Sequence, residues 1–173
     1  AYLAAISVNP TVEFKVIWLN TWFDPGKEAD AAKALIDQGA DVIMQHTDSP
    51  AAMTVAEQEG VYAFGQASDM IAYGPNAQLT SIIDNWAPYY ILRTKDIIDG
   101  TWKSTDTWGG IDSGMVELAK ISDKVPTVIK NLVEQANEGI VNGTLHPFTG
   151  PINKQDGSVW LVEGEVASDG DLL

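Results

Sequence analysis

The chain has 173 residues, of which 45% are hydrophobic and 20% charged, a composition typical of a globular protein that can bury a sizeable core. Its 24 acidic and 10 basic residues give a formal net charge of −14, which repels nucleic acids and anionic membrane surfaces and argues against binding to either. The absence of cysteine excludes disulfides, thiolate metal sites and cysteine nucleophiles.

The first predicted element is the end of a helix at residues 1–7, terminated by Val8, Asn9 and Pro10. No charged leader or initiator Met precedes it, and no apolar run approaches the roughly 20 residues of a membrane span. We therefore expect a fragment that begins inside a larger protein and carries no export signal of its own.

A complete α/β unit follows. Residues 14–19 form a short apolar run that predicts a buried strand. Asp24 and Pro25 suit the cap and the first position of a helix over residues 27–38, and Gly39 suits its end.

The alternation of strands and helices continues along the chain. Further strands are predicted at 41–45, 61–65 and 78–83, further helices at 50–59, 88–99 and 125–141, and a short strand at 159–162 that could form a hairpin or an edge. This rhythm predicts an α/β fold with a doubly wound parallel sheet.

Aromatic and polar residues follow two successive predicted strands. Asn20 and Trp22 come after the first strand. The second is followed by Gln45, His46, Thr47 and Asp48. Ligands of doubly wound sheets bind beyond the carboxyl ends of the strands, and an indole there can stack on a heterocycle. The alternative for Trp22 is packing in the core beside Trp18.

The chemistry of an enzyme is not evident. The chain has two histidines, so His46 lacks a partner for a histidine-based metal site. The best candidates for a paired catalytic acid and base are Asp48 with His46 and Asp69 with Asp84. The sequence spacing of neither pair forces the two side chains to lie close together. No phosphate loop, dinucleotide fingerprint, serine elbow or zinc signature is present. We expect no enzyme, no metal and no cofactor.

Four segments in order carry a family resemblance: NTWFDPGKEADAAKALIDQGADVIMQH, GVYAFGQASDM, LTSIIDNW and DGTWKSTDTWGG. Together they resemble the basic membrane protein family of ABC-transporter substrate-binding lipoproteins, whose best-known branch is the purine nucleoside receptors. The resemblance implies a type I periplasmic binding protein with two α/β lobes and the ligand between them. On that likeness residues 1–84 and 108–173 belong to the C-terminal lobe, residues 85–107 form a crossover segment, and the N-terminal lobe is missing.

The same resemblance implies roles for single residues. It puts Trp22 against a purine ring. Asp69 matches an acidic position whose carboxylate can accept a hydrogen bond from a purine amine or ring N–H, although a turn-forming aspartate explains it equally well. Trp86 lies where the chain crosses to the other lobe, and Trp108 and Gly109 lie where it returns.

The chain departs from the nucleoside-binding members at two positions. Where those members use an acidic residue and a lysine to hold ribose hydroxyls, this sequence has Ala87 and Ile111. A free nucleobase is therefore the expected ligand in preference to a nucleoside.

The resemblance implies a transport receptor in the periplasm or on the cell surface as a lipoprotein, which presents a purine to an ABC permease. A ligand-sensing domain of the same fold in a regulator or signalling receptor is the alternative. Because half of the ligand-binding cleft is expected to be missing, the chain is also expected to self-associate through residues 85–108.

Overall fold

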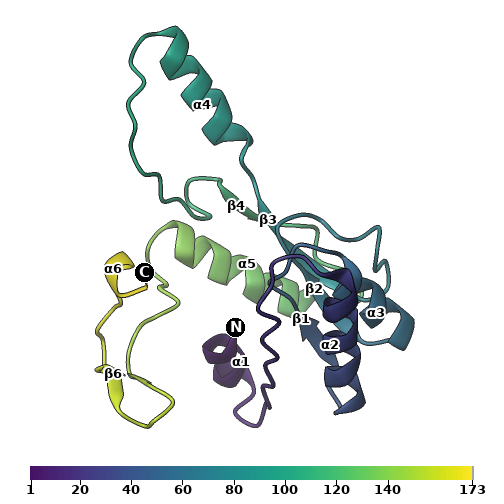
Figure 1. Ribbon diagram of the computed structural model, residues 1–173. Helices are drawn as coiled ribbons and strands as arrows, with labels where there is room; N and C mark the ends of the chain where they lie inside the picture. The colour runs from purple at the N-terminus through teal and green to yellow at the C-terminus, as the bar shows by residue number, and fades with distance from the viewer. Residues whose placement is uncertain (173) are drawn as a thin grey trace. The chain divides into compact units, whose positions relative to one another are not determined.

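The computed structural model describes residues 1–172. The chain divides into two compact units: one runs over residues 15–132, and the other combines residues 1–14 with the stretch from residue 133 onward. Each unit is described by itself below (Figure 1).

The larger unit contains an α/β arrangement. Its elements are α2 (Pro25–Asp37), β1 (Val42–Met44), α3 (Ala51–Glu59), β2 (Tyr62–Gly65), β3 (Gln78–Asp84), α4 (Ala87–Ile98) and β4 (Val116–Leu118). The division between the two units falls within α5 (Thr127–Val141).

The four strands of this unit form one sheet in the order β1-β2-β3-β4. The β1–β2 and β2–β3 pairs are parallel, and β3 pairs antiparallel with β4, Ile82 facing Leu118. The predicted α/β fold with a mostly parallel sheet is confirmed. The antiparallel strand β4 was not predicted.

The predicted strand at residues 14–19 is wrong. A strand exists only where its backbone groups bond to a neighbouring strand, and no backbone hydrogen bond among the described residues involves this segment. Its one hydrogen bond runs from the Lys15 ammonium to the Gln38 carbonyl, at 2.9 Å. Trp18 is 83% exposed, and β1 has β2 as its sole neighbour in the described sheet.

Helix boundaries follow the capping signals in the sequence. The Asp24 carboxylate accepts a hydrogen bond from the Lys27 N–H at the start of α2, and Pro25 is the first helical residue. Gly60 ends α3 in the left-handed region at φ 73°, a conformation that costs glycine little. The predicted helices at 27–38 and 50–59 are thus confirmed within two residues.

The core of the larger unit is built mostly from small side chains. Helix α3 packs on α2 and on strands β1 and β2. The buried core residues are Ala32, Ile43, Ala52, Met53, Ala56, Ala63, Met70 and Ala77. Alanines at the helix contacts allow the backbones to approach closely, and the larger buried side chains are Ile43, Met53 and Met70.

Strands β2 and β3 also approach closely at one glycine. A Cβ atom on Gly65 would overlap the Ser81 side chain and come within 3.2 Å of the Gln78 amide oxygen. Gly65 pairs directly with Ser81 in the register. The close approach of the two strands therefore requires glycine at this position.

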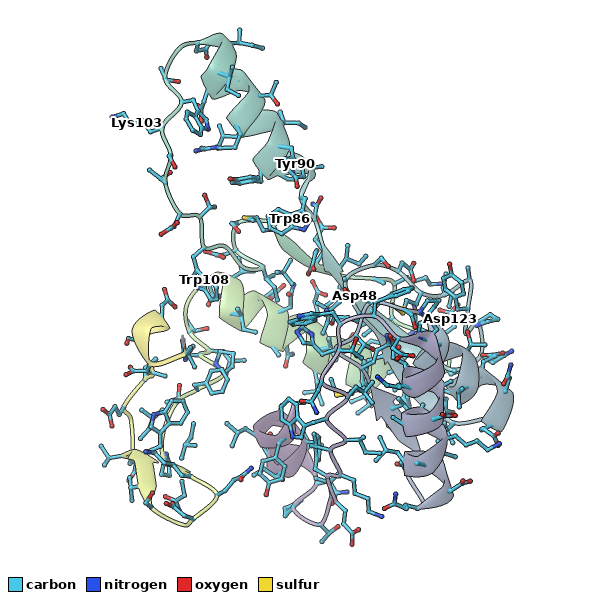
Figure 2. All side chains as sticks on the ribbon, viewed as in Figure 1. Asp48, Trp86, Tyr90, Lys103, Trp108 and Asp123 are labelled. Carbon is cyan, nitrogen blue, oxygen red and sulfur yellow. The ribbon has the colours of Figure 1, made fainter. Side chains whose placement is uncertain are left out.

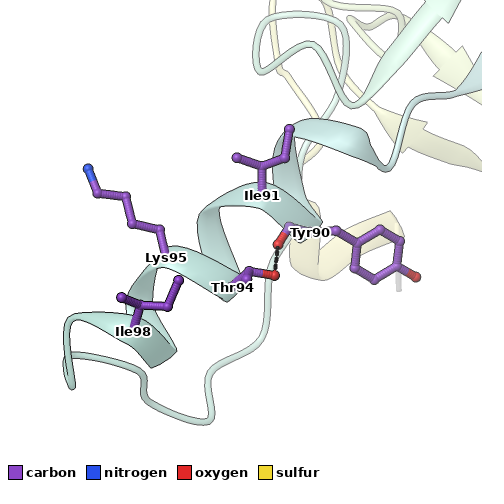
Figure 3. Close-up of a pocket in the computed structure, with 5 residues that line it drawn as sticks. All are labelled: Tyr90, Ile91, Thr94, Lys95 and Ile98. Carbon is purple, nitrogen blue, oxygen red and sulfur yellow. Dashed lines mark hydrogen bonds between the residues drawn. The ribbon is translucent and has the colours of Figure 1, made fainter.

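Helix α4 extends away from the sheet at the end of β3, and the chain returns through a long loop to β4 (Figure 1). None of its residues is buried, and Ile91 and Ile98 are 70% and 78% exposed. A shallow hollow of about 420 Å³ on its surface is lined by Tyr90, Ile91, Thr94, Lys95 and Ile98 (Figure 3). The helix therefore leaves apolar side chains uncovered within residues 1–172.

The smaller unit contains α1 (Tyr2–Val8), the hairpin of β5 (Ile152–Asn153) and β6 (Val159–Leu161), and α6 (Asp169–Leu172). Ile152, Leu161 and Ala167 form its buried cluster. The hairpin that the sequence suggested for residues 159–162 is confirmed, since β6 pairs antiparallel with β5.

Across residues 1–172, no helix is both long and apolar enough to cross a membrane.

Candidate functional site

The loop that precedes α2 and the loop that follows β1 lie against each other. The Asp48 N–H donates a 2.9 Å hydrogen bond to the Trp22 carbonyl. The Trp22 indole and the His46 imidazole meet edge to face, with ring centroids 5.7 Å apart and planes inclined at 72°. The structure thus brings together the residues that sequence reasoning selected from separate segments.

Trp22 is not part of the core. Its side chain is 67% exposed, so it does not pack beside Trp18 as the alternative interpretation required. Asn20, two residues earlier, has a positive φ of 53°, which asparagine tolerates better than most residues. This turn separates the indole from the extended segment before it.

A buried carboxylate holds the two loops. Glu28 on α2 is 2% exposed. Its Oε1 accepts a hydrogen bond from the Asp24 N–H at 3.0 Å, and its Oε2 accepts bonds from the Thr47 and Ser49 hydroxyls at 2.9 and 2.6 Å. These three bonds satisfy both carboxylate oxygens and join the start of α2 to the loop after β1.

Gln45 completes the second loop. Its side-chain N–H groups donate to the Thr47 and Ser49 carbonyls at 3.1 and 2.7 Å. The amide oxygen is buried and has no hydrogen-bond partner among the described residues. The Gln45 side chain therefore stabilises the turn that follows it. His46 and Asp48, within the same turn, are exposed to solvent.

Asp69 has two structural partners. Its Oδ1 accepts a 2.8 Å hydrogen bond from the Gln78 amide and a 3.1 Å bond from the Ile71 N–H. The second bond is the local turn that aspartate commonly forms. The residue remains exposed, so the carboxylate keeps free acceptor capacity beside these partners.

The crossover residues form a separate group. Trp86 packs against Tyr89 and Tyr90, at centroid distances of 5.9 and 6.1 Å. No hydrogen bond, ion pair or ring contact within residues 1–172 connects Trp86 or Trp108 with the loops of Trp22 and Asp48. Figure 2 shows Trp86 at the base of the α4 arm and Asp48 on the sheet body.

Gly109 lies close to two side chains of the segment that precedes β4. A Cβ there would come within 2.6 Å of Met115 Sδ and of Ser113 Oγ. Trp108 is 70% exposed. The pair therefore presents an indole beside a tightly packed glycine in the chain that leads to β4.

The site offers stacking surface and hydrogen-bonding groups, and its electrostatics are mild. The pKa of the nearby Asp24 carboxyl is lowered by the Lys27 backbone N–H and by the Lys27 ammonium, 3.2 Å away. No group of three or more His, Asp or Glu side chains in residues 1–172 could hold a metal ion. Such an arrangement can bind a flat polar heterocycle.

Sequence reasoning missed Glu28 and Ser49, which organise the loops. An acidic residue on a helix is normally read as solvent-exposed. The available signal was a glutamate four residues after the Asp24 cap, close to the pattern in which a glutamate side chain returns to the cap backbone.

A mostly parallel α/β sheet with rings and polar groups at its strand ends is the architecture of one lobe of a solute-binding protein. Residues 3–149 match the Bmp family, described as ABC transporter substrate-binding protein PnrA-like. The chain belongs to this family, as its resemblance predicted.

Two relatives show how the match is distributed. A purine-binding protein of Brucella abortus (strain 2308) is 58% identical over 171 residues, which cover 99% of this chain and 49% of that protein. A putative ABC transporter glucose-binding protein of Haloferax volcanii is 36% identical over 176 residues, covering 96% of this chain and 45% of that protein. The chain spans about half the length of these relatives.

Solved structures share the fold. An ABC transporter solute-binding protein from Conexibacter woesei DSM 14684 has a TM-score of 0.66 at 21% identity, covering 84% of this chain and 49% of that one. A transcriptional activator of the comK gene from Bacillus halodurans has a TM-score of 0.64 at 20% identity, covering 74% and 46%. The fold therefore occurs both in transport and in regulatory proteins.

Proposed function

We propose that this chain is the C-terminal lobe of an ABC-transporter receptor that binds a purine between two lobes and presents it to a membrane permease. The name two-lobe receptor is used below for this chain joined to an N-terminal lobe. The observation that carries the proposal is the exposed Trp22 indole beside His46 at a strand end. An indole in that setting supplies a stacking surface for a flat base.

The ligand class is supported by the 58% identity to a purine-binding protein. Hydrogen-bonding groups suit the edge of a purine, since Asp48 supplies an acceptor and His46 a ring nitrogen beside the indole, and Asp69 supplies an acceptor after β2. The receptor performs no chemistry in this proposal. Closure of the lobes follows from the affinity that the ligand gains by touching both of them.

A free nucleobase is the proposed ligand in preference to a nucleoside. Ala87 is the first residue of α4 and is exposed, and Ile111 is half-buried. Neither side chain can hydrogen-bond a ribose hydroxyl. The family resemblance implies that nucleoside-binding members have a carboxylate and an ammonium group at these two positions.

The crossover segment 85–107 is proposed to contact the N-terminal lobe. The uncovered apolar side chains of α4 support this assignment, because monomeric proteins rarely leave such a patch in water. The receptor acts outside the cytoplasm, in the periplasm or as a cell-surface lipoprotein. Identity to a purine-binding protein favours transport over the sensing alternative.

Calorimetry on the two-lobe receptor tests the proposal. Adenine, hypoxanthine and guanine are titrated beside their nucleosides and beside glucose, the sugar in the name of the Haloferax relative. We expect a base to bind more tightly than its nucleoside, and glucose not to bind. Tight glucose binding without purine binding would refute the proposal that the receptor transports a purine. Tighter binding of a nucleoside than of its base would refute only the assignment of a free nucleobase.

A further inference from the structure

Glu28 is not among the residues proposed to contact the ligand. It is nevertheless one of the most buried polar side chains of the larger unit, at 2% exposed. The hydrogen bonds and ion pairs of the described residues include no cation at this carboxylate. A buried acidic group costs free energy unless hydrogen bonds replace its lost water. The three donors from Asp24, Thr47 and Ser49 provide that replacement.

Each donor lies within two residues of a residue of the candidate site. Asp24 is two residues after Trp22, while Thr47 lies between His46 and Asp48. The Asp48 N–H in turn bonds to the Trp22 carbonyl at 2.9 Å. Glu28, the two loops and this bond form a closed ring of contacts that includes the Trp22 backbone and Thr47, the residue after His46.

We propose that Glu28 is a positioning residue of the binding site: its buried carboxylate fixes the spacing between the Trp22 loop and the His46–Asp48 loop. The effect on purine binding rests on the proposed function. The effect on the spacing of the two loops rests on the geometry alone. Fixing two loops before the ligand arrives removes an ordering cost from binding. Loss of the carboxylate therefore weakens binding even where the fold survives.

Glu28→Gln is the sharpest variant. The amide keeps the size of the side chain and one acceptor oxygen, which the Thr47 and Ser49 hydroxyls can share. Its NH₂ group then faces the Asp24 N–H, so two donors meet and that bond is lost. Ser49→Ala is the milder second variant, since it removes one of the two hydroxyl donors.

Glu57→Gln is the matched control. Glu57 on α3 also accepts three hydrogen bonds, each of 2.7 Å, from the Asn76 N–H, the Asn76 amide and the Ala77 N–H. Its partners precede β3, at the amino ends of the parallel strands. The control loses comparable hydrogen bonds away from the Trp22 and His46 loops.

The first measurement needs no ligand. In the 173-residue chain, the indole N–H resonance of Trp22 is assigned by comparison with Trp22→Phe and followed by ¹H–¹⁵N NMR. We expect it to shift and broaden in Glu28→Gln and Ser49→Ala, because the His46 imidazole no longer holds a fixed place beside the indole. It should stay unchanged in Glu57→Gln, although we expect urea unfolding to show that this variant is destabilised by the loss of its hydrogen bonds.

The second measurement is the purine Kd of the two-lobe receptor. We expect about a tenfold increase in Kd for Glu28→Gln and none for Glu57→Gln. An unchanged indole resonance and an unchanged Kd in folded Glu28→Gln would overturn the positioning role, as would equal effects in both glutamate variants. If the unmodified receptor binds no purine, the proposed function fails, and the indole resonance alone decides the role of Glu28.

Discussion

The indole of Trp22 lies edge to face against the imidazole of His46, with centroids 5.7 Å apart, although the two residues are 24 positions apart in the sequence. Most of the Trp22 side chain stays open to solvent, since it is 67% exposed. A largely exposed ring held in place by one neighbouring ring is suited to stack on a flat ligand.

Replacing Trp22 with alanine should therefore weaken purine binding by the two-lobe receptor. Stacking of a base on an aromatic ring contributes about 1 to 3 kcal/mol, so the calorimetric Kd should rise accordingly. Trp18→Ala is the control, because that side chain is 83% exposed and makes no ring contact among the described residues. Unfolding of Trp22→Ala with unchanged affinity per folded molecule would instead assign the indole to stability.

The chain without an N-terminal lobe should bind purines weakly or not at all. A cleft gains affinity by enclosing its ligand, and here the Trp22 and His46 rings can contact only one side of it. Calorimetry with the same purine on the 173-residue chain and on the two-lobe receptor compares the two directly. Equal affinities would show that a second lobe contributes nothing to the site.

The same chain should self-associate through α4. Ile91 and Ile98 line the hollow on this helix and are 70% and 78% exposed, so pairing two copies removes apolar surface from water. Sedimentation velocity over a concentration series should show a dimer or larger species, which Ile91→Glu with Ile98→Glu should reduce. Val159→Glu, at a 61% exposed position of the smaller unit, should leave it unchanged. A chain that stays monomeric at high concentration contradicts this expectation.

Acid should destabilise the larger unit through Glu57. The Asn76 side-chain amide, followed by the Ala77 and Asn76 N–H groups, lowers the pKa of the Glu57 carboxyl below its ordinary value of 4.5. Because the pKa is lower in the folded chain, this contribution to stability is complete above about pH 4.5 and is lost as the pH falls through the folded value.

Glu57→Gln removes the titration. Urea unfolding between pH 6 and pH 3 should show a steeper loss of free energy in the unmodified chain than in the variant, with the difference confined to the acid side of this range. Parallel pH profiles for the two proteins would mean that the hydrogen bonds to Glu57 do not favour its ionised form.

Sequence patterns predicted the elements whose signals are local. Asp24 and Pro25 specify the start of α2, and the left-handed Gly60 specifies the end of α3. The predicted strand at 14–19 was wrong because a run of apolar residues measures only the capacity to form a strand. Formation also needs a partner edge, and these residues make no backbone hydrogen bond.

Elements and roles that depend on distant partners were missed. Strand β4 has three residues and exists through its pairing with β3, which short-range patterns do not report. Glu28 resembles any acidic residue on a helix surface until Thr47 and Ser49 are brought beside it. Trp22, His46 and Asp48 do lie together, although no strand precedes Trp22 among the described residues: the Asp48 N–H bonds to the Trp22 carbonyl, and Glu28 holds the start of α2 to the loop after β1.

The contact of Gly65 with Ser81 has a consequence for how this sequence can evolve. Any side chain at position 65 collides with position 81 on the paired strand, so neither site is free to vary alone toward larger residues. A saturation library at position 65 should return glycine alone in folded clones. Libraries that randomise both positions should recover alanine at 65 only together with glycine at 81, a compensating exchange that keeps the volume between the strands.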